Sequence, residues 1–299
     1  MATMVTDFDA FIETAWADHA DDAAGVADRL AASLAQVDAP ARVAPYARLV
    51  THVYGEHLAR YDDGVALLAR LRALPVAQDA PEPQAAIARA VATLRYCAGD
   101  AAALEALPHD DRVAALATAA AAFVGRKTIR AAIDAYAAAL ALASAGLADG
   151  SPALRALAVG GNNLAAELEE KPDRDAFETR AMLAAAQGAL DCWRRAGGWL
   201  EEERAEFRLS SSRCAAGEYD GAILHAERCL ALCRAHDAPP LEHFFGLAAL
   251  ALAQRSAGLA DEFARTREAA RECHARIDPD ERAWCEATLA SLDDAAAAT

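Results

Sequence analysis

Residues 206–233 read EFRLSSSRCAAGEYDGAILHAERCLALC, and this stretch decides the fold. Gly217 separates two segments of helical spacing. Glycine commonly lies just past a helix end because it adopts a positive φ at no steric cost. Asp220 follows at a position where a new helix N-terminus favours a carboxylate. The stretch therefore predicts one helix, a tight turn and a second helix.

The second helix carries mostly small side chains at three- and four-residue spacing, namely Ala222, Ala226, Cys229 and Leu230. Residues at this spacing share one helix face, and small side chains let a neighbouring helix approach closely. A single hairpin cannot bury both of its faces. The pattern therefore predicts further hairpins packed beside this one.

Two other stretches repeat the pattern at constant offsets. The first lies 158 residues earlier (219 − 61) and carries Tyr61, Gly64, Leu68 and Leu71. The second lies 90 residues earlier (219 − 129) and carries Ile129, Ala132, Tyr136 and Ala139. A further turn glycine, Gly258, lies 41 residues after Gly217 (258 − 217). These offsets predict an array of similar hairpins.

The repeated hairpin resembles a tetratricopeptide repeat. Its G-x-Y-x-x-A turn and small-residue second helix are matched by Gly217, Tyr219, Ala222, Ala226 and Cys229. A spacing near 41 residues exceeds the usual repeat of about 34 and is typical of the long-helix type found in kinesin light chains and in some bacterial regulators. The resemblance implies an all-α fold, a right-handed superhelical stack of antiparallel helix hairpins.

We expect a single α-solenoid domain over residues 1–299, with an N-terminal helix pair at 1–38 and a frayed tail at 293–299. Between them we expect hairpins over 39–277, clearest over 152–277, and a capping helix at 278–292 that covers the last apolar face. The prolines of the segment Val76–Gln84 predict a linker there. The short stretch Ala101–Leu107 predicts a second helix that is too short for its hairpin.

Composition limits the classes of function. The chain has a formal charge of −16 and few lysines, which argues against nucleic acid as a partner because phosphate contacts need clustered lysine and arginine. Apolar residues make up 55%, mainly alanine and leucine, which indicates helices and no sheet.

The sequence also predicts a cytoplasmic protein without a membrane partner. No apolar run approaches the ~20 residues of a membrane span, and the N-terminus MATMVTDFDAF lacks a basic region and an apolar core of a secretory signal. The seven cysteines are an odd number at scattered helical positions, which favours reduced thiols in the cytoplasm.

The resemblance further implies a binding surface, because the first helices of such arrays line a concave groove. The stretch GNNLAAEL, residues 161–168, places Asn162 and Asn163 near that groove. The next first helix adds Arg204, Phe207, Arg208, Ser211 and Ser212. Two alternatives stay open: the asparagines could bond a neighbouring loop, and the arginines could pair with Glu201, Glu202 or Glu203 at helical spacing. Binding of an acidic peptide C-terminus has little support, because the lysines of the family's carboxylate clamp are missing.

We expect no metal, no cofactor and no catalytic site. His225, Cys229 and Cys233 share a helix face and could meet one metal ion, but Cys229 occupies a packing position. His52 and His57 lie five residues apart, so on an α-helix they point in different directions. The sequence contains no phosphate loop, nucleophile elbow or zinc-protease motif.

The predicted function is a scaffold that binds a protein or peptide partner in the groove. A ligand- or peptide-sensing regulator that acts through another protein is a second hypothesis, and an accessory subunit of an enzyme is a third. The sequence identifies neither the partner nor the oligomeric state.

Overall fold

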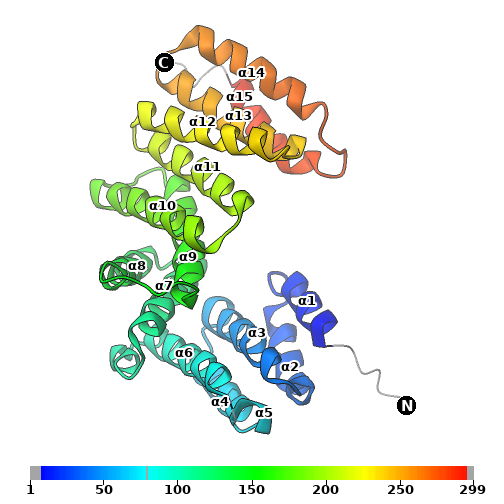
Figure 1. The fold of residues 1–299 in the computed structure, drawn as a ribbon, viewed down its shortest axis with the longest axis vertical. Coiled ribbons are helices and arrows are strands. Elements are labelled where there is room, and N and C mark those ends of the chain that lie inside the picture. The colour runs from blue at the N-terminus through cyan, green and yellow to red at the C-terminus, as the bar shows by residue number, and fades with distance from the viewer. Residues whose placement is uncertain (1–7, 79, 295–299) are drawn as a thin grey trace. The chain divides into compact units, whose positions relative to one another are not determined.

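The computed structural model describes residues 8–78 and 80–294, and in these residues it contains helices and no β-strand. The predicted all-α class is therefore confirmed (Figure 1). The chain forms two compact units, residues 1–160 and 161–299. The single domain expected over 1–299 stays a prediction.

Unit 1 consists of helices that pack against their neighbours in the chain. The bounds are α1 (Phe8–Asp18), α2 (Ala23–Ser33), η1 (Leu34–Gln36), α3 (Pro40–Thr51), the π-helix η2 (His52–His57), α4 (Tyr61–Arg72), α5 (Pro75–Gln78), α6 (Pro81–Cys97), η3 (Ala101–Leu104), α7 (His109–Gly125) and α8 (Ile129–Ala143). The next helix, α9 (Pro152–Glu170), contains the boundary between the units.

Unit 2 continues the hairpins, and its first helices α9, α11 and α13 alternate with the second helices α10, α12 and α14. The bounds are α10 (Ala176–Ala196), α11 (Trp199–Ala215), α12 (Tyr219–Ala235), α13 (Pro240–Ser256), α14 (Ala260–His274), η4 (Arg282–Cys285) and α15 (Glu286–Asp293). Helix α11 packs along α12, and α13 packs along both α12 and α14.

The turn at Gly217 ends α11 and starts α12. Gly217 has a φ of 79°, and its N–H donates to the Cys214 carbonyl at 3.1 Å. The N–H of Glu218 donates to the Arg213 carbonyl at 2.9 Å, which completes the pair of bonds that defines a Schellman motif. The chain thus reverses direction with its last helical carbonyls satisfied.

A left-handed residue recurs at the offsets found in the sequence. Ala59 has a φ of 50° and Lys127 a φ of 58°, and these residues lie 158 and 90 positions before Gly217 (217 − 59 and 217 − 127). Helices α4, α8 and α12 accordingly begin at aligned positions, Tyr61, Ile129 and Tyr219. The predicted hairpin repeats are confirmed at these three positions.

Small residues bring the helices of unit 2 close together, as the sequence predicts. Ala222, Ala226 and Cys229 on α12 are fully buried. A Cβ atom added to Gly246 of α13 would lie 3.0 Å from the Cys229 sulfur, closer than almost all carbon contacts in proteins. The absence of a side chain at Gly246 therefore sets the approach of α13 to α12.

Helices α1 and α2 are the first two helices of the described residues. The Asp22 carboxylate accepts from the Gly25 N–H at 2.9 Å and so caps the start of α2. Residues 1–7 and 295–299 lie outside the described residues. They contain most of the N-terminal stretch MATMVTDFDAF, in which no secretory signal is predicted, and most of the predicted frayed tail.

Two local predictions are wrong. Pro81 and Pro83 do not belong to a linker, since they lie in the first turn of α6, where the missing N–H of proline costs nothing. The capping segment is not one helix: η4 is followed by the short helix α15, and Cys285 and Leu292 are buried in the C-terminal core.

The predicted shortness of the third hairpin is confirmed, because η3 is a single 3₁₀ turn.

The described ranges contain no helix that is both long and apolar enough to span a membrane.

Replacing Gly217 by alanine should lower the free energy of unfolding by about 1 kcal/mol, because a Cβ is disfavoured in the left-handed region. No atom lies within 4 Å of the added Cβ, so the effect reports backbone strain alone. The opposite change, Ala59→Gly, relieves the same strain and should raise the free energy by up to about 1 kcal/mol. Urea unfolding measures both, and losses of stability at both positions would contradict a shared left-handed turn.

Replacing the fully buried Ala226 by leucine should destabilise unit 2 by roughly 1–3 kcal/mol, because the added carbons overpack the contact. The matched control is Glu227→Leu at the exposed neighbouring position, which should change stability little. Thermal melts of the two variants would contradict the assignment of the packed face if they were alike.

Candidate functional site

Helices α9 and α11 of unit 2 bring two predicted site residues together. The Arg208 Nε donates to Asn162 Oδ1 at 3.4 Å, and the Arg208 Nη1 forms an ion pair with Glu169. The other oxygen of Glu169 accepts from the Ser212 hydroxyl at 2.5 Å. Burial raises the pKa of Glu169, and the neighbouring Arg208 opposes that rise. The result is a fixed polar network of an amide, a guanidinium, a carboxylate and a hydroxyl.

Helix α13 supplies a second carboxylate. Arg204 donates through Nη2 to Glu242 Oε1 at 2.5 Å, with Nε 3.5 Å from the other oxygen. The side chain of Arg204 is 60% exposed, whereas that of Glu242 is 9% exposed. The arginines of α11 therefore pair with carboxylates on the neighbouring helices α9 and α13. The sequence pattern suggested acidic partners within α11 itself and does not reveal Glu169 or Glu242.

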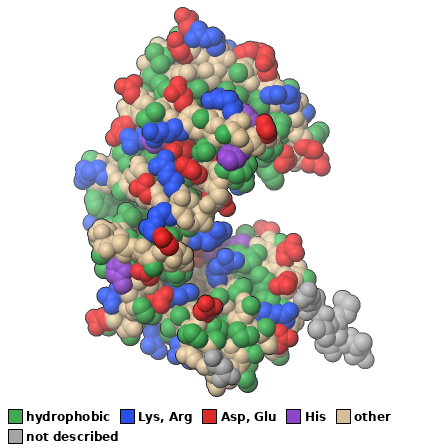
Figure 2. All heavy atoms as spheres, in the orientation of Figure 1, with side chains coloured by type: hydrophobic (Ala, Val, Ile, Leu, Met, Phe, Trp, Pro, Cys, Tyr) green, Lys and Arg blue, Asp and Glu red, His purple; other side chains and the backbone are tan. Residues whose placement is uncertain are grey.

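The other predicted site residues lie on the same helices. The ring of Phe207 meets that of Phe245 from α13 edge to face, with centroids 6.0 Å apart. Ser211 is half-buried and its hydroxyl donates to the Phe207 carbonyl at 3.2 Å within α11. Asn163 is exposed on α9. We call Asn162, Asn163, Arg204, Phe207, Arg208 and Ser211 the first-helix surface. Figure 2 shows acidic and basic side chains interspersed on the visible face.

A second polar cluster lies buried between α11 and α12. The Glu206 carboxylate accepts from His225 Nδ1 at 2.6 Å and from Arg194 Nη2 at 2.6 Å. Its neighbour Glu203 lies beside the thiols of Cys229, at 2.8 Å, and Cys233, at 3.5 Å. The histidine and the two cysteines of the sequence pattern are therefore divided between two carboxylates.

Glu203 has an unusual environment for a carboxyl group. Burial, with the charge of Glu242 nearby, raises its pKa to about 7, and the thiol hydrogen bonds oppose that rise. The hydrogen bond with Cys233 raises the pKa of Cys229, and burial and the charge of Glu203 raise it further. Ligand atoms of Glu203, Cys229 and Cys233 lie within 4.8 Å of one another. The two cysteines of α12 therefore face a carboxylate of α11, Glu203, which the sequence pattern did not connect with them.

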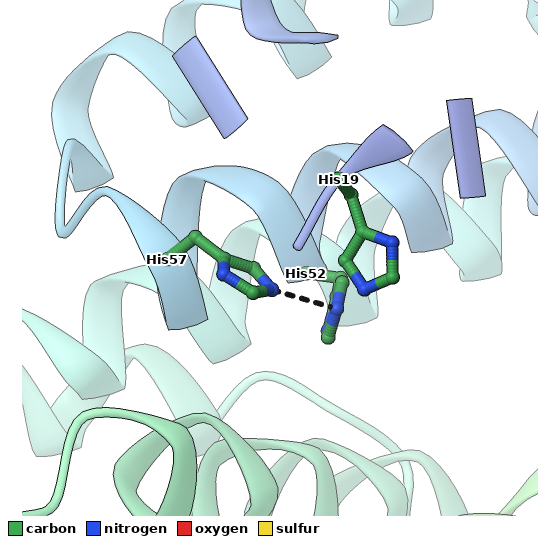
Figure 3. A group of neighbouring side chains, drawn as sticks. All are labelled: His19, His52 and His57. Atoms are coloured by element: carbon green, nitrogen blue, oxygen red, sulfur yellow. Dashed lines mark hydrogen bonds between the residues drawn. The ribbon is translucent and has the colours of Figure 1, made fainter. Parts of the chain in front are cut away.

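Unit 1 contains a cluster of histidines, His19, His52 and His57 (Figure 3). The prediction that His52 and His57 point in different directions is wrong, because their Nε2 atoms lie 3.1 Å apart. The two residues bracket the π-helix η2, whose wider turn aligns positions i and i+5. Burial, with His52 close by, lowers the pKa of His57.

Glu203→Gln should change the pH dependence of stability. A carboxyl pKa raised from 4.5 to about 7 means that the folded chain keeps a proton which the unfolded chain loses. Stability is therefore lost as the pH rises from about 4.5 to about 7, and the neutral amide escapes that loss. At pH 8 the variant should be more stable than wild type by up to about 3 kcal/mol, and at pH 4 the two should converge. Urea unfolding across this range checks the prediction, with exposed Glu227→Gln as the control.

Comparison with known proteins supports the fold. No protein-family model and no curated protein matches the sequence. Among solved structures, the nearly identical TPR-like repeats of a protein described as a kinesin light chain from Podosopora anserina match 81% of this chain and 99% of their own, at 13% identity and a TM-score of 0.51. BtubC (BKLC) from P. vanneervenii matches 90% of this chain and 92% of its own at 18% identity, with a TM-score of 0.46. With the hairpins and turns described above, the chain has a tetratricopeptide-like fold.

Proposed function

We propose that the chain is a scaffold that binds a protein or an extended peptide on the first-helix surface of unit 2. Helical-repeat folds generally use the surface formed by successive helices for binding. The observation that carries the proposal is the network in which Arg208 links Asn162 to Glu169 across α9 and α11. It holds polar groups in defined positions at a half-buried surface.

The charges of this surface favour a peptide without a dominant negative charge. Arg208 and Arg204 are each neutralised by a carboxylate, Glu169 and Glu242 respectively. A peptide carboxylate would have to displace these partners, and the loss of a partly buried ion pair would oppose its binding. Backbone amides of a peptide can instead bond the side-chain amides of Asn162 and Asn163 without breaking an ion pair.

Apolar contact would add to these bonds. Phe207 and Phe245 meet edge to face and are each partly exposed, so they offer an aromatic patch beside the exposed Arg204. Aromatic residues and arginine are the types that contribute most to protein interfaces. The expected ligand is therefore an extended segment with an apolar side chain flanked by free backbone amides.

Replacing Asn162 and Asn163 together by alanine should weaken partner binding several-fold and change the melting temperature little, because the higher helix propensity of alanine offsets the lost bond from Arg208 to Asn162. Each lost hydrogen bond contributes about 0.5–1.5 kcal/mol net. The partner is first isolated from the native cell with wild-type protein and then titrated into both forms by calorimetry.

The matched control is Arg228→Ala, an exposed arginine on the second helix α12 of the same unit. It should bind like wild type, whereas Arg204→Ala should bind more weakly. Equal affinities for wild type and the asparagine variant, at equal melting temperatures, would place the binding site elsewhere.

A further inference from the structure

Three imidazoles gather in unit 1 from two separate segments. His19 lies in the turn after α1, and His52 and His57 lie at the two ends of η2. The ring centroids are 4.7 Å apart for His19 and His52, 5.0 Å for His19 and His57, and 4.8 Å for His52 and His57. One ring nitrogen from each residue lies within 4.8 Å of those of the other two. Figure 3 shows the three rings as neighbours, with His57 joined to His52 by the contact between their ring nitrogens.

The π-helix η2 brings the rings of His52 and His57 together. On an α-helix, residues five apart are rotated by about 140° around the axis and cannot share a ligand. In η2 the N–H of Leu58 donates to the Val53 carbonyl at 3.0 Å, a bond across five residues that widens the turn. His52 and His57 therefore lie one above the other. Single π-turns of this kind are frequently found at functional sites.

Hydrogen bonds to the far nitrogens orient two of the rings. Nδ1 of His52 lies 2.9 Å from a Glu56 carboxylate oxygen, and Nδ1 of His19 lies 2.6 Å from the Trp16 carbonyl. Both acceptors require a proton on Nδ1, which leaves the lone pair on Nε2. The Nε2 atom of His52 faces Nε2 of His57 at 3.1 Å. With a lone pair on His52 Nε2, the proton of this contact comes from His57 Nε2. The interior of the cluster thus offers the lone pairs of His19 and His52, and a third lone pair when His57 carries its proton on Nδ1 instead.

Glu56 is held in place by the helix opposite. A Cβ added to Gly125, the last residue of α7, would come within 2.3 Å of the Glu56 side chain. The lack of a side chain at Gly125 therefore provides the space in which Glu56 reaches His52. A carboxylate that binds the outer nitrogen of a ligating histidine fixes its tautomer and raises its basicity, and such partners are typical of metal sites.

We propose that His19, His52 and His57 bind one divalent transition-metal cation, zinc by preference, with Glu56 as the residue that positions His52. Zinc–nitrogen bonds of about 2.0–2.1 Å place two tetrahedral ligands about 3.3 Å apart, close to the separation of His52 and His57. The ring nitrogen of His19 lies within 4.8 Å of the other two, so it has to approach them by up to about 1.5 Å (4.8 − 3.3) to complete the set. Three imidazoles leave the fourth coordination position of a tetrahedral ion open. Neutral imidazole binds zinc in preference to calcium or magnesium, which favour oxygen ligands.

The test is a zinc titration by calorimetry of untagged protein that has been stripped with a chelator. Wild type should bind one equivalent. His57→Gln and His19→Gln should each weaken binding by 100-fold or more, and Glu56→Gln by about 10–100-fold. His19 lies in a half-buried turn, so its variant tests the site even if a change within η2 disturbs folding. Cobalt added in place of zinc should give visible absorption bands that are lost in both histidine variants.

Two matched controls complete the experiment. His243→Gln, on α13 in the other unit, should bind zinc like wild type, and so should the double variant Cys229→Ser, Cys233→Ser. The absence of zinc binding in wild type would overturn the proposal. Binding that survives His19→Gln or His57→Gln, or that is lost in the cysteine variant, would overturn it as well.

Discussion

The reversal of the chain within a few residues is the constraint on which the hairpins depend. A helix that ends with unsatisfied carbonyls can turn back tightly only if one residue enters the left-handed region and the following N–H groups bond the last turn. Gly217 meets this condition with bonds to Cys214 and, through Glu218, to Arg213. The turn fixes where α12 begins and thus which of its faces meets α11. Because that face carries alanine and cysteine, the helices approach closely enough to exclude water from the buried carboxylates.

The turn positions show how far the sequence predicts the fold. Gly217 is recognisable, and the spacing of the small residues after it locates two more hairpins. Ala59 and Lys127 occupy the same left-handed position. Neither residue type predicts a turn, because a residue with a Cβ atom rarely adopts this strained conformation. The π-turn is harder still. The wider turn before Ala59 has no propensity signal of its own, and in the sequence it leaves only a spacing of five between His52 and His57, which on an α-helix would point in different directions.

In the candidate site, too, the sequence predicts local patterns but not the contacts made between helices. Asparagines in succession and arginines on the next first helix are visible as local patterns, and the structure does join Asn162 to Arg208. Their carboxylate partners are not visible, since Glu169 and Glu242 lie about 40 residues from the arginines in a chain rich in acidic residues. Pairing across helices is decided by which side chains the turns bring opposite one another. Burial then makes the pairing strict, because an unpaired charge in that environment would cost several kcal/mol.

The polar clusters of the two units differ in a way that bears on their chemistry. In unit 2 donors face acceptors: Arg208 meets Glu169, His225 and Arg194 meet Glu206, and the thiols meet Glu203. Each pair matches a donor with an acceptor, and among these groups Oε2 of Glu203 is the buried oxygen that has no hydrogen-bond partner in the described residues. In the histidine cluster of unit 1 the outer nitrogens of two rings already donate to Glu56 and to a backbone carbonyl, and the inner nitrogens face one another. One proton can join His52 to His57 but leaves the third ring without a comparable bond. A cation at the common point attracts all three lone pairs at once, which is why the arrangement of acceptors favours a metal ion over a purely structural contact.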